Sequence, residues 1–475
     1  MRRLAALAGI ALLLASPAAL SQQQSLSGLS QSDRAQGAEG YKQIVSQFGG
    51  KVDGPLAEYV RAVGLRVAMV SVPGSRPQDW TITVLNSPVP NAMATPGGYL
   101  YITRGLLAMI NTEAELASVL GHEAGHVAGR HSAKRQGRAM AGALATLGAA
   151  IFGGSNAAQI VNYGSTALVS GYSRGQEDDA DTRGLRYLVQ AGYDPRAAAS
   201  MLQALERVSE VEGKAAIERS GVASIFSSHP VTADRIRRVA QQAAKLPAGG
   251  KVGRDPYLGA ISGMAFGDAT DQGIVNGPTF RHAGLNFGFD APPGFRLQNS
   301  PQAVVGQGPG GARFQFQGVP ARPGQPLEPV VSQVWSQLTQ GQRPQVNYDE
   351  TRLNGFDAAV STTRLSSNGR PMDVGVTAIR GDGNQIFVIL TQAPGGSGGQ
   401  FDGLLRSFRK LTPQELATAG KGRRLEVVTV KQGDTVRALS GRMAPPYNRE
   451  ASFLALNGIG NRPLVPGERL KLIIG

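Results

Sequence analysis

The stretch His122-Glu123-Ala124-Gly125-His126 lies in a segment whose apolar residues repeat at helical spacing. Two histidines four residues apart lie on one face of a helix, one turn apart, so both imidazoles can bind one zinc ion. The glutamate after the first histidine can reach a water molecule on that ion and take its proton. The chain has only 5 histidines among 475 residues, so this pattern is rare by chance. It predicts a helix with two metal ligands, His122 and His126, and a general base, Glu123. The alternative is an amphipathic helix with a solvated polar face.

The expected start of this helix is Thr112. Thr112-Glu113-Ala114-Glu115 fits a capping box, in which the threonine caps the helix and Glu115 reaches back to the cap. Leu116, Val119, Leu120 and Val127 supply the buried stripe.

A zinc peptidase site needs three protein ligands and one open position for water. An acidic cluster at the start of another expected helix, within Ser173–Asp181, is the candidate source of the third. Glu177 and Asp181 are one turn apart, so both can face the metal helix. One carboxylate would bind the ion and the other would hydrogen-bond a ligand histidine from behind. Spacing alone leaves open simple complementation of the helix dipole.

The remaining histidines carry less specific signals. His131 lies five residues past His126, off the one-turn position, so it is not expected to be a ligand. His282 lies in a later part of the chain and is expected to be structural or exposed.

These two motifs together resemble the HtpX/BepA/Oma-type zinc metallopeptidases, over roughly residues 30–245. The matching patterns are His122-Glu123-x-Gly125-His126 and Ser173-Arg174-x-x-Glu177-x-x-Ala180-Asp181. The resemblance implies one zinc ion per chain, bound by His122, His126 and Glu177. It also implies that Glu123 is the catalytic acid/base. Asp181 would not bind the ion itself and would instead hydrogen-bond a ligand histidine.

Two further segments match the same family. Residues 91–98, followed by Thr103-Arg104-Gly105-Leu106-Leu107, imply an edge strand that receives substrate by β-augmentation. Ser228-His229-Pro230 matches a late His-Pro segment. The resemblance places His229 near the metal, as a catalytic residue that either gates the metal or steadies the oxyanion.

The N-terminus is typical of an export signal. Two arginines precede an apolar core at Leu4–Leu14, and Ala19-Leu20-Ser21 supplies small residues before Gln22. The chain contains no cysteine, which excludes a lipoprotein anchor and disulfides. We expect a signal peptide at 1–21, an uncleaved anchor being the alternative, and a location in the periplasm or cell envelope.

Composition and pattern divide the rest of the chain. We expect a metallopeptidase domain at 22–250, mainly helical and zincin-type with a small sheet, then a linker at 251–279. An α+β module of unknown role follows at 280–412. An apolar run at 139–153 is too short to span a bilayer. It predicts a closely packed helix, or alternatively one that contacts the membrane peripherally.

The last segment, 424–475, resembles a LysM module. Val428–Val436, Leu456-Asn457-Gly458 and Pro466–Leu472 carry the resemblance, which implies a small βααβ unit that binds peptidoglycan. A LysM-shaped spacer is the alternative. Residues 403–475 hold 13 Lys+Arg against 5 Asp+Glu, within a net charge of +14. In an exported protein this favours an anionic envelope component over nucleic acid.

These observations predict an exported zinc metalloendopeptidase that cleaves protein or peptide substrates. The resemblance points to quality control of misfolded or misassembled outer-membrane proteins. The alternative is a peptidoglycan-associated chaperone or scaffold whose metal site is not catalytic.

Overall fold

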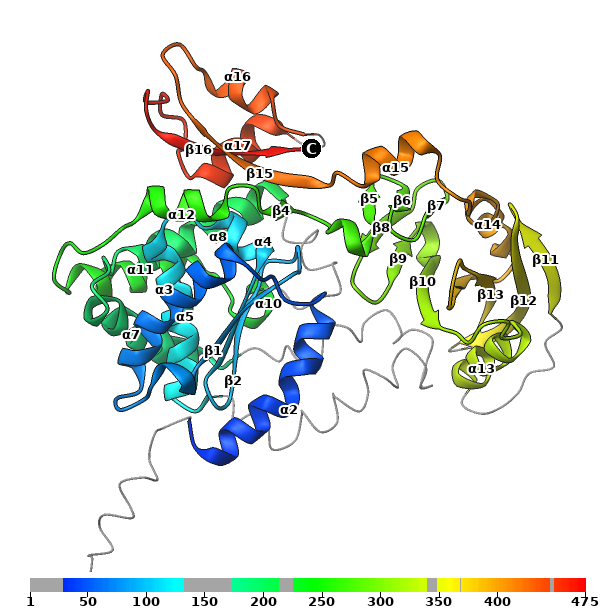
Figure 1. Cartoon of the computed structure of the whole chain (residues 1–475), viewed down its shortest axis with the longest axis horizontal. Helices are drawn as coiled ribbons and strands as arrows, with labels where there is room; N and C mark the ends of the chain where they lie inside the picture. Colours follow the sequence, from blue (N-terminus) through cyan, green and yellow to red (C-terminus); the bar gives the residue numbers. More distant parts are fainter. Residues whose placement is uncertain (1–28, 132–171, 213–224, 340–347, 368, 445–447) are drawn as a thin grey trace, which may run out of the picture.

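The computed structural model describes residues 29–131, 172–212, 225–339, 348–367, 369–444 and 448–475. They form a helical body with a small sheet, a β-rich unit beside it, and a C-terminal unit packed on the helical body (Figure 1). The predicted multidomain mixture of helices and sheets is therefore confirmed. The expected signal peptide and the apolar run at 139–153 lie outside the described residues. No helix within the described ranges is both long and apolar enough to cross a membrane.

The helix that carries the H-E-x-x-H sequence is α5, Glu113–Ala128, and Thr112 caps it as predicted. The Thr112 hydroxyl accepts a hydrogen bond from the Glu115 backbone N–H. The predicted second half of the capping box is wrong. The Glu115 carboxylate accepts from the backbone N–H of Asn111, one residue before the cap, and from the Ser200 hydroxyl. Because Ser200 lies on α8, Ala197–Glu212, Glu115 joins two helices as well as supporting one end of α5.

Glycines allow α5 to lie close against α7, Arg174–Gln190. A Cβ atom on Gly125 would lie 3.1 Å from the Ala180 carbonyl oxygen, and one on Gly184 would lie 3.3 Å from the His122 nitrogen. Both distances are tighter than most Cβ contacts in proteins, so a larger residue at either position would push the two helices apart. This close approach brings the acidic start of α7 to the histidines of α5.

A three-stranded sheet packs beside α5. Its strands are β1 (Thr81–Leu85), β3 (Tyr99–Thr103) and β2 (Ala92–Thr95), in the order β1-β3-β2. β1 and β3 are parallel, whereas β2 and β3 are antiparallel. The expected edge strand, β2, is thus one of the two outer strands of this described sheet, and it packs against α5.

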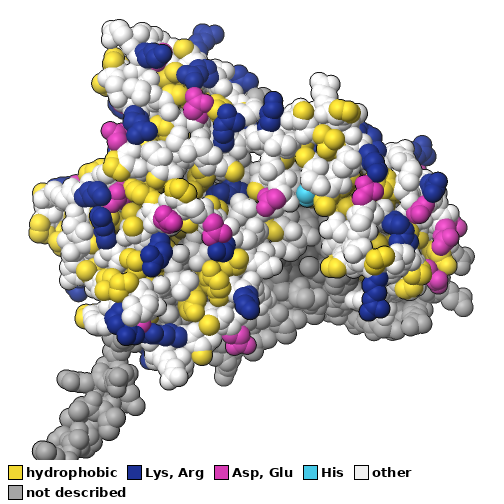
Figure 2. Space-filling view, viewed as in Figure 1, with side chains coloured by type: hydrophobic (Ala, Val, Ile, Leu, Met, Phe, Trp, Pro, Cys, Tyr) yellow, Lys and Arg dark blue, Asp and Glu magenta, His cyan; other side chains and the backbone are white. Residues whose placement is uncertain are grey.

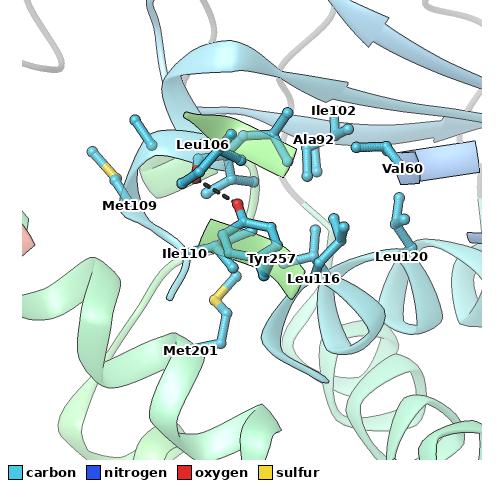
Figure 3. Packing of buried hydrophobic residues seen from close by; sticks show 14 of the residues in the cluster. Val60, Ala92, Ile102, Leu106, Met109, Ile110, Leu116, Leu120, Met201 and Tyr257 are labelled. Atoms are coloured by element: carbon cyan, nitrogen blue, oxygen red, sulfur yellow. Dashed lines mark hydrogen bonds between the residues drawn. The ribbon is translucent and has the colours of Figure 1, made fainter. Parts of the chain in front are cut away.

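The core of the helical body lies between this sheet and its helices, as Figure 3 shows for Leu116, Leu120 and Ile102. The other helices of this body are α2 (Gln31–Gln47), α3 (Pro55–Ser71), α4 (Arg104–Met109), α10 (Ile225–Ser228), α11 (Ala233–Ala244) and α12 (Arg254–Ile261).

The segment expected to be a linker, 251–279, contributes α12 to this core. Tyr257, Leu258 and Ile261 are fully buried, and the Tyr257 hydroxyl donates to the Leu107 carbonyl at 2.6 Å (Figure 3). The sequence pattern of this segment was too weak to predict α12, a short helix with three buried side chains.

The β-rich unit contains an antiparallel sheet of seven strands in the order β11-β12-β13-β14-β10-β9-β8 and a smaller sheet, β5-β6-β7. Phenylalanines dominate the core under the smaller sheet, while Trp335 on α13 packs on the other side of the large sheet. The strands and helices of this unit are β5 (Ile274–Asn276), β6 (Thr279–His282), β7 (Phe287–Asp290), β8 (Arg296–Asn299), β9 (Val304–Gln307), β10 (Arg313–Pro320), α13 (Glu328–Leu338), β11 (Asp349–Leu353), β12 (Phe356–Ser367), β13 (Arg370–Arg380), β14 (Gln385–Pro394), α14 (Asp402–Ser407) and α15 (Pro413–Ala419).

The C-terminal unit has the element order β15 (Arg423–Thr429), α16 (Val436–Gly441), α17 (Arg449–Asn457) and β16 (Arg469–Ile474). β15 pairs with β16 and also with β4, Ala265–Phe266. Its core is continuous with that of the helical body, because Leu425, Ala455 and Leu456 belong to the same buried cluster as α5.

Candidate metal centre

Three histidines and one glutamate converge at the contact between α5 and α7. His122 and His126 come from α5, Glu177 comes from the first turn of α7, and His229 immediately follows α10. One ligand-type atom from each lies within 4.8 Å of all the others. His126, Glu177 and His229 are buried, and the His122 side chain is 13% exposed. Of the residues predicted to bind metal, the structure brings all three together and adds His229.

The spacing of these atoms fits a tetrahedral metal ion. The His122 Nε2 atom lies 3.0 Å from His126 Nε2 and 3.2 Å from His229 Nδ1. The Glu177 Oε1 atom lies 2.8 Å from His229 Nδ1 and 3.4 Å from His126 Nε2. Atoms bound to zinc at about 2.0–2.1 Å in tetrahedral geometry lie about 3.3–3.4 Å apart. The donor set is therefore of the right size and chemistry for one such ion.

Two buried charged residues support this cluster from behind. The Asp181 Oδ1 atom lies 3.0 Å from His122 Nδ1, the ring nitrogen that faces away from the cluster. Arg235, on α11, forms two hydrogen bonds with the Asp181 carboxylate, at 2.7 and 2.9 Å, and lies 2.8 Å from Glu177 Oε2. Arg235 thus joins two carboxylates, and it also donates to the Pro230 carbonyl at 3.4 Å.

Electrostatics keep both of these carboxylates ionised. Burial alone raises the pKa of Glu177, but the facing His229 and His126 rings outweigh burial and hold the pKa well below its usual range. Burial also opposes ionisation of Asp181, but His122 and Arg235 outweigh it and lower that pKa. An ionised carboxylate is the form that binds a metal or accepts an imidazole N–H.

Glu123 lies beside the cluster and does not belong to it. Its side chain is 1% exposed, and burial raises its pKa above the usual value for a glutamate. The Glu123 Oε1 atom lies 3.5 Å from His229 Nε2. The Oε2 atom is buried and has no hydrogen-bond partner among the described residues. A buried carboxylate oxygen that is free to accept a proton is what a general base requires.

An apolar cavity of about 40 Å³ opens next to His122, Glu123 and His229. Helices α5, α7, α8 and α11 enclose it, with Leu202 and Val239 among the lining residues. Apolar walls lower the local dielectric and strengthen electrostatic interactions in the adjoining site.

Helical spacing predicted only that His131 is not a ligand and gave no contact for it. It lies outside the four-residue cluster, as expected, yet its Nδ1 atom is 2.9 Å from His126 Nδ1. Tyr172 was also missed, and its ring stacks on His126 with centroids 3.7 Å apart. No spacing rule could have found these contacts, because neither residue shares a regular helical face with His126. His282 lies on β6, half-buried against Phe287, far along the chain from this cluster.

Residues 56–243 match the sequence profile of peptidase family M48. This chain therefore carries a domain that belongs to peptidase family M48, a metallopeptidase family, as its resemblance to the Oma/BepA type predicted.

Three relatives illustrate the similarity. Mitochondrial metalloendopeptidase OMA1 of Schizosaccharomyces pombe is 31% identical over 42% of this chain and 58% of its own length. The putative beta-barrel assembly-enhancing protease of Vibrio cholerae is 31% identical over 41% of this chain and 40% of its own. Metalloprotease LoiP of Escherichia coli is 30% identical over 31% of this chain and 57% of its own. The chain thus spans 40–58% of the length of these relatives.

Solved structures add no argument about fold or function. A protein of Bacteroides thetaiotaomicron aligns over 42% of this chain and 87% of its own, at 11% identity and a TM-score of 0.23. LpqN of Mycobacterium tuberculosis, described as involved in cell envelope biogenesis, aligns over 26% of this chain and 83% of its own, at 12% identity and a TM-score of 0.20.

Proposed function

We propose that this chain is an exported zinc-dependent endopeptidase that acts on proteins of the cell envelope. The observation that carries the proposal is the cluster of His122, His126, Glu177 and His229 with the buried carboxylate of Glu123 beside it. The family membership of residues 56–243 supports the same reading.

In this proposal His122, His126 and Glu177 hold the ion. Zinc, when bound, supplies a Lewis acid for the scissile carbonyl and for the attacking water. The Asp181 Oδ1 atom, 3.0 Å from His122 Nδ1, favours a hydrogen on that nitrogen and so keeps the Nε2 lone pair directed at the cluster. Glu123 accepts the proton of the attacking water at Oε2 and later gives it to the leaving amine.

His229 lies in the same cluster as these three residues and would take a fourth position on an ion held there. Four protein atoms fill a tetrahedral site, whereas a catalytic zinc site keeps one position for water. We therefore assign His229 the role of a gate, which must move away before water and substrate can enter. The segment that ends at His229 lies next to the residues that precede β2, because the Ile225 backbone N–H donates a hydrogen bond to the Pro90 carbonyl at 2.8 Å.

Substrate is proposed to bind as an extended strand next to β2. This strand lies at the margin of its described sheet and packs against α5. A peptide paired with such an edge presents its backbone carbonyls in regular register, whatever its side chains are. That mode suits an enzyme that cleaves unfolded or misassembled proteins.

The envelope location rests on the expected signal peptide at 1–21 and on the relatives named beta-barrel assembly-enhancing protease. Misassembled outer-membrane proteins are the proposed substrates. Figure 2 shows Lys and Arg side chains over the visible face of the C-terminal unit. The +8 surplus of residues 403–475, which include this unit, and its β-α-α-β order support a LysM-like unit that binds peptidoglycan or another anionic envelope component.

A scaffold with a structural metal site is the second candidate, because four protein ligands close structural zinc sites. Zinc content and casein cleavage, measured on wild type and Glu123→Gln, distinguish the two. The enzyme predicts one zinc per chain in both proteins and cleavage by the wild type alone. Glu58→Gln, which alters an exposed glutamate on α3, is the control and should cleave normally. Zinc-bound wild type that is as inert as Glu123→Gln would support the scaffold.

A further inference from the structure

His131 and Asp179 extend the metal centre at His126, whereas Asp181 contacts His122. The His131 Nδ1 atom lies 2.9 Å from His126 Nδ1, and the His131 Nε2 atom lies 3.1 Å from Asp179 Oδ2. His131 is buried, whereas the Asp179 side chain is 41% exposed and also accepts from Arg183 Nε at 2.7 Å. These contacts form a continuous path from a surface carboxylate to His126.

Only one assignment of protons satisfies every contact on this path when the rings are neutral. His126 directs Nε2 into the cluster, so its hydrogen must be on Nδ1. That N–H donates to His131 Nδ1, which must then be an acceptor. The hydrogen of His131 is therefore on Nε2, where it donates to Asp179. The His122 ring must also carry its hydrogen on Nδ1, and there the carboxylate is adjacent: the Nδ1 atom lies 3.0 Å from Asp181.

The backbone after α5 is shaped to place His131 there. The helix ends at Ala128, and Arg130 takes a left-handed conformation with φ 52°, which reverses the direction of the chain. A Cβ atom on Gly129 would lie 2.5 Å from His131 Nε2, so only glycine leaves room for the folded-back ring. The Gln176 side chain also donates to the His131 carbonyl at 3.4 Å.

A further contact restrains the face of the same ligand ring. The Tyr172 ring stacks on His126 with an interplanar angle of 16° and centroids 3.7 Å apart. His131 holds the edge of the imidazole and Tyr172 covers its face, so both the tilt and the rotation of His126 are restricted. The His126 side chain is completely buried, and no solvent competes for its Nδ1 hydrogen.

We propose that His131 and Asp179 are positioning residues that fix the tautomer and orientation of His126 and thereby strengthen metal binding. This inference rests on the proposed metal centre and deepens it. The two histidines of α5 then receive equivalent support, His122 from a carboxylate directly and His126 from a carboxylate through an intervening imidazole. Loss of such partners lowers metal affinity by about 10- to 100-fold in known sites.

The test is the zinc affinity of the purified full-length chain, measured by competition with a chromogenic chelator. His131→Ala and Asp179→Asn should each weaken zinc binding, by about 10- to 100-fold for His131→Ala and less for Asp179→Asn because its side chain is exposed. His131→Asn should restore much of the affinity, since its side-chain oxygen can replace Nδ1 as the acceptor. His131→Gln places its amide nearer the Nε2 position and should not.

Two control variants separate positioning from general damage. His282→Ala removes a histidine far from the site, and Asp178→Asn changes the neighbouring carboxylate, which pairs with Arg238 instead. Both should bind zinc as the wild type does. Absorption of the Co²⁺-substituted protein gives a second readout, because a reoriented His126 alters the ligand field in His131→Ala and not in His131→Asn.

The outcomes also separate this inference from the proposed function. If wild type binds zinc and His131→Ala binds it equally tightly, the positioning role is overturned and the metal centre stands. Equal losses of affinity in His131→Ala and His131→Asn, in step with a lower apo melting temperature, would also overturn it. Wild type that binds no zinc would overturn the metal centre itself.

Discussion

His229 is the residue whose role the structure changes most. The resemblance placed it near the metal, and in the structure its Nδ1 atom lies 2.8 Å from Glu177 and 3.2 Å from His122, within the four-residue cluster. A ring at that distance competes with water for the fourth position of a tetrahedral ion. If His229 is a gate, removing its ring should speed peptide cleavage. If His229 stabilises the oxyanion, removing its ring should slow cleavage.

We expect His229→Ala to raise peptide cleavage by the resting enzyme, because the variant leaves the fourth position open to water. Initial rates on a quenched fluorescent peptide measure this, with zinc content determined in parallel. His282→Ala should leave the rate unchanged. A fall in kcat of about 10²- to 10³-fold, the cost of losing an oxyanion donor, would instead assign His229 to transition-state stabilisation.

At the scale of elements, the contact between α5 and α7 decides whether a site exists. Gly125 and Gly184 let the two helix backbones approach, and Glu177 reaches the histidines only because they do. The H-E-x-G-H pattern therefore contains a packing requirement as well as chemistry, because a side chain at Gly125 would meet the backbone of α7 at Ala180.

Gly184→Val is expected to destabilise the chain by about 1–3 kcal/mol through overpacking. It should also weaken zinc binding, since Glu177 moves away with α7. Gly175→Ala is the matched control on the same helix, because a Cβ atom there meets nothing within 4 Å. It should leave zinc binding intact and stabilise the fold by about 0.5–1 kcal/mol. Urea denaturation with zinc titration measures both, and a Gly184→Val protein with unaltered zinc affinity would contradict this account.

At the scale of the whole molecule, the C-terminal unit is joined to the end of α4, the helix that precedes α5. Lys471 is 0% exposed, and its Nζ atom donates to the carbonyls of Ala108 and Ile110 at 2.7 and 2.8 Å. These carbonyls are at the end of α4, where an ammonium group complements the helix dipole. The unit is therefore joined to the helical body by buried contacts and shares its core with α5.

Stability should depend on pH through this lysine. Burial lowers the pKa of Lys471 to about 7, whereas an unfolded lysine keeps its usual value of about 10.4. Between these values the unfolded chain binds more protons, so the free energy of unfolding rises with pH over that range. The contribution of Lys471 is therefore least favourable below about pH 7.

Lys471→Met should remove this rise and should also lower stability at high pH, because two buried carbonyls lose their donor. Urea unfolding at pH 7 and pH 9 measures both effects. Lys431→Met, an exposed lysine of the same unit, is the control and should keep the wild-type pH dependence. A wild-type chain whose stability is flat across this range would contradict the prediction.

The sequence by itself determined which site residues share a face of one helix. The positions of His122, Glu123 and His126 on α5 follow from helical periodicity, and Thr112 marks where that helix begins. Spacing also offered Glu177 and Asp181 as candidates, and the resemblance to the Oma/BepA type assigned their roles and added His229. The roles of these residues stay predictions, although the structure brings them together.

Tertiary structure alone decided the contacts that cross between elements. Helical phase excluded His131, yet the chain reverses at Arg130 and returns its ring to His126. The buried helix α12 and the insertion of Lys471 were equally hidden. The physical reason is that periodicity reports neighbours within one element, whereas these contacts depend on how closely helices pack and where the backbone turns.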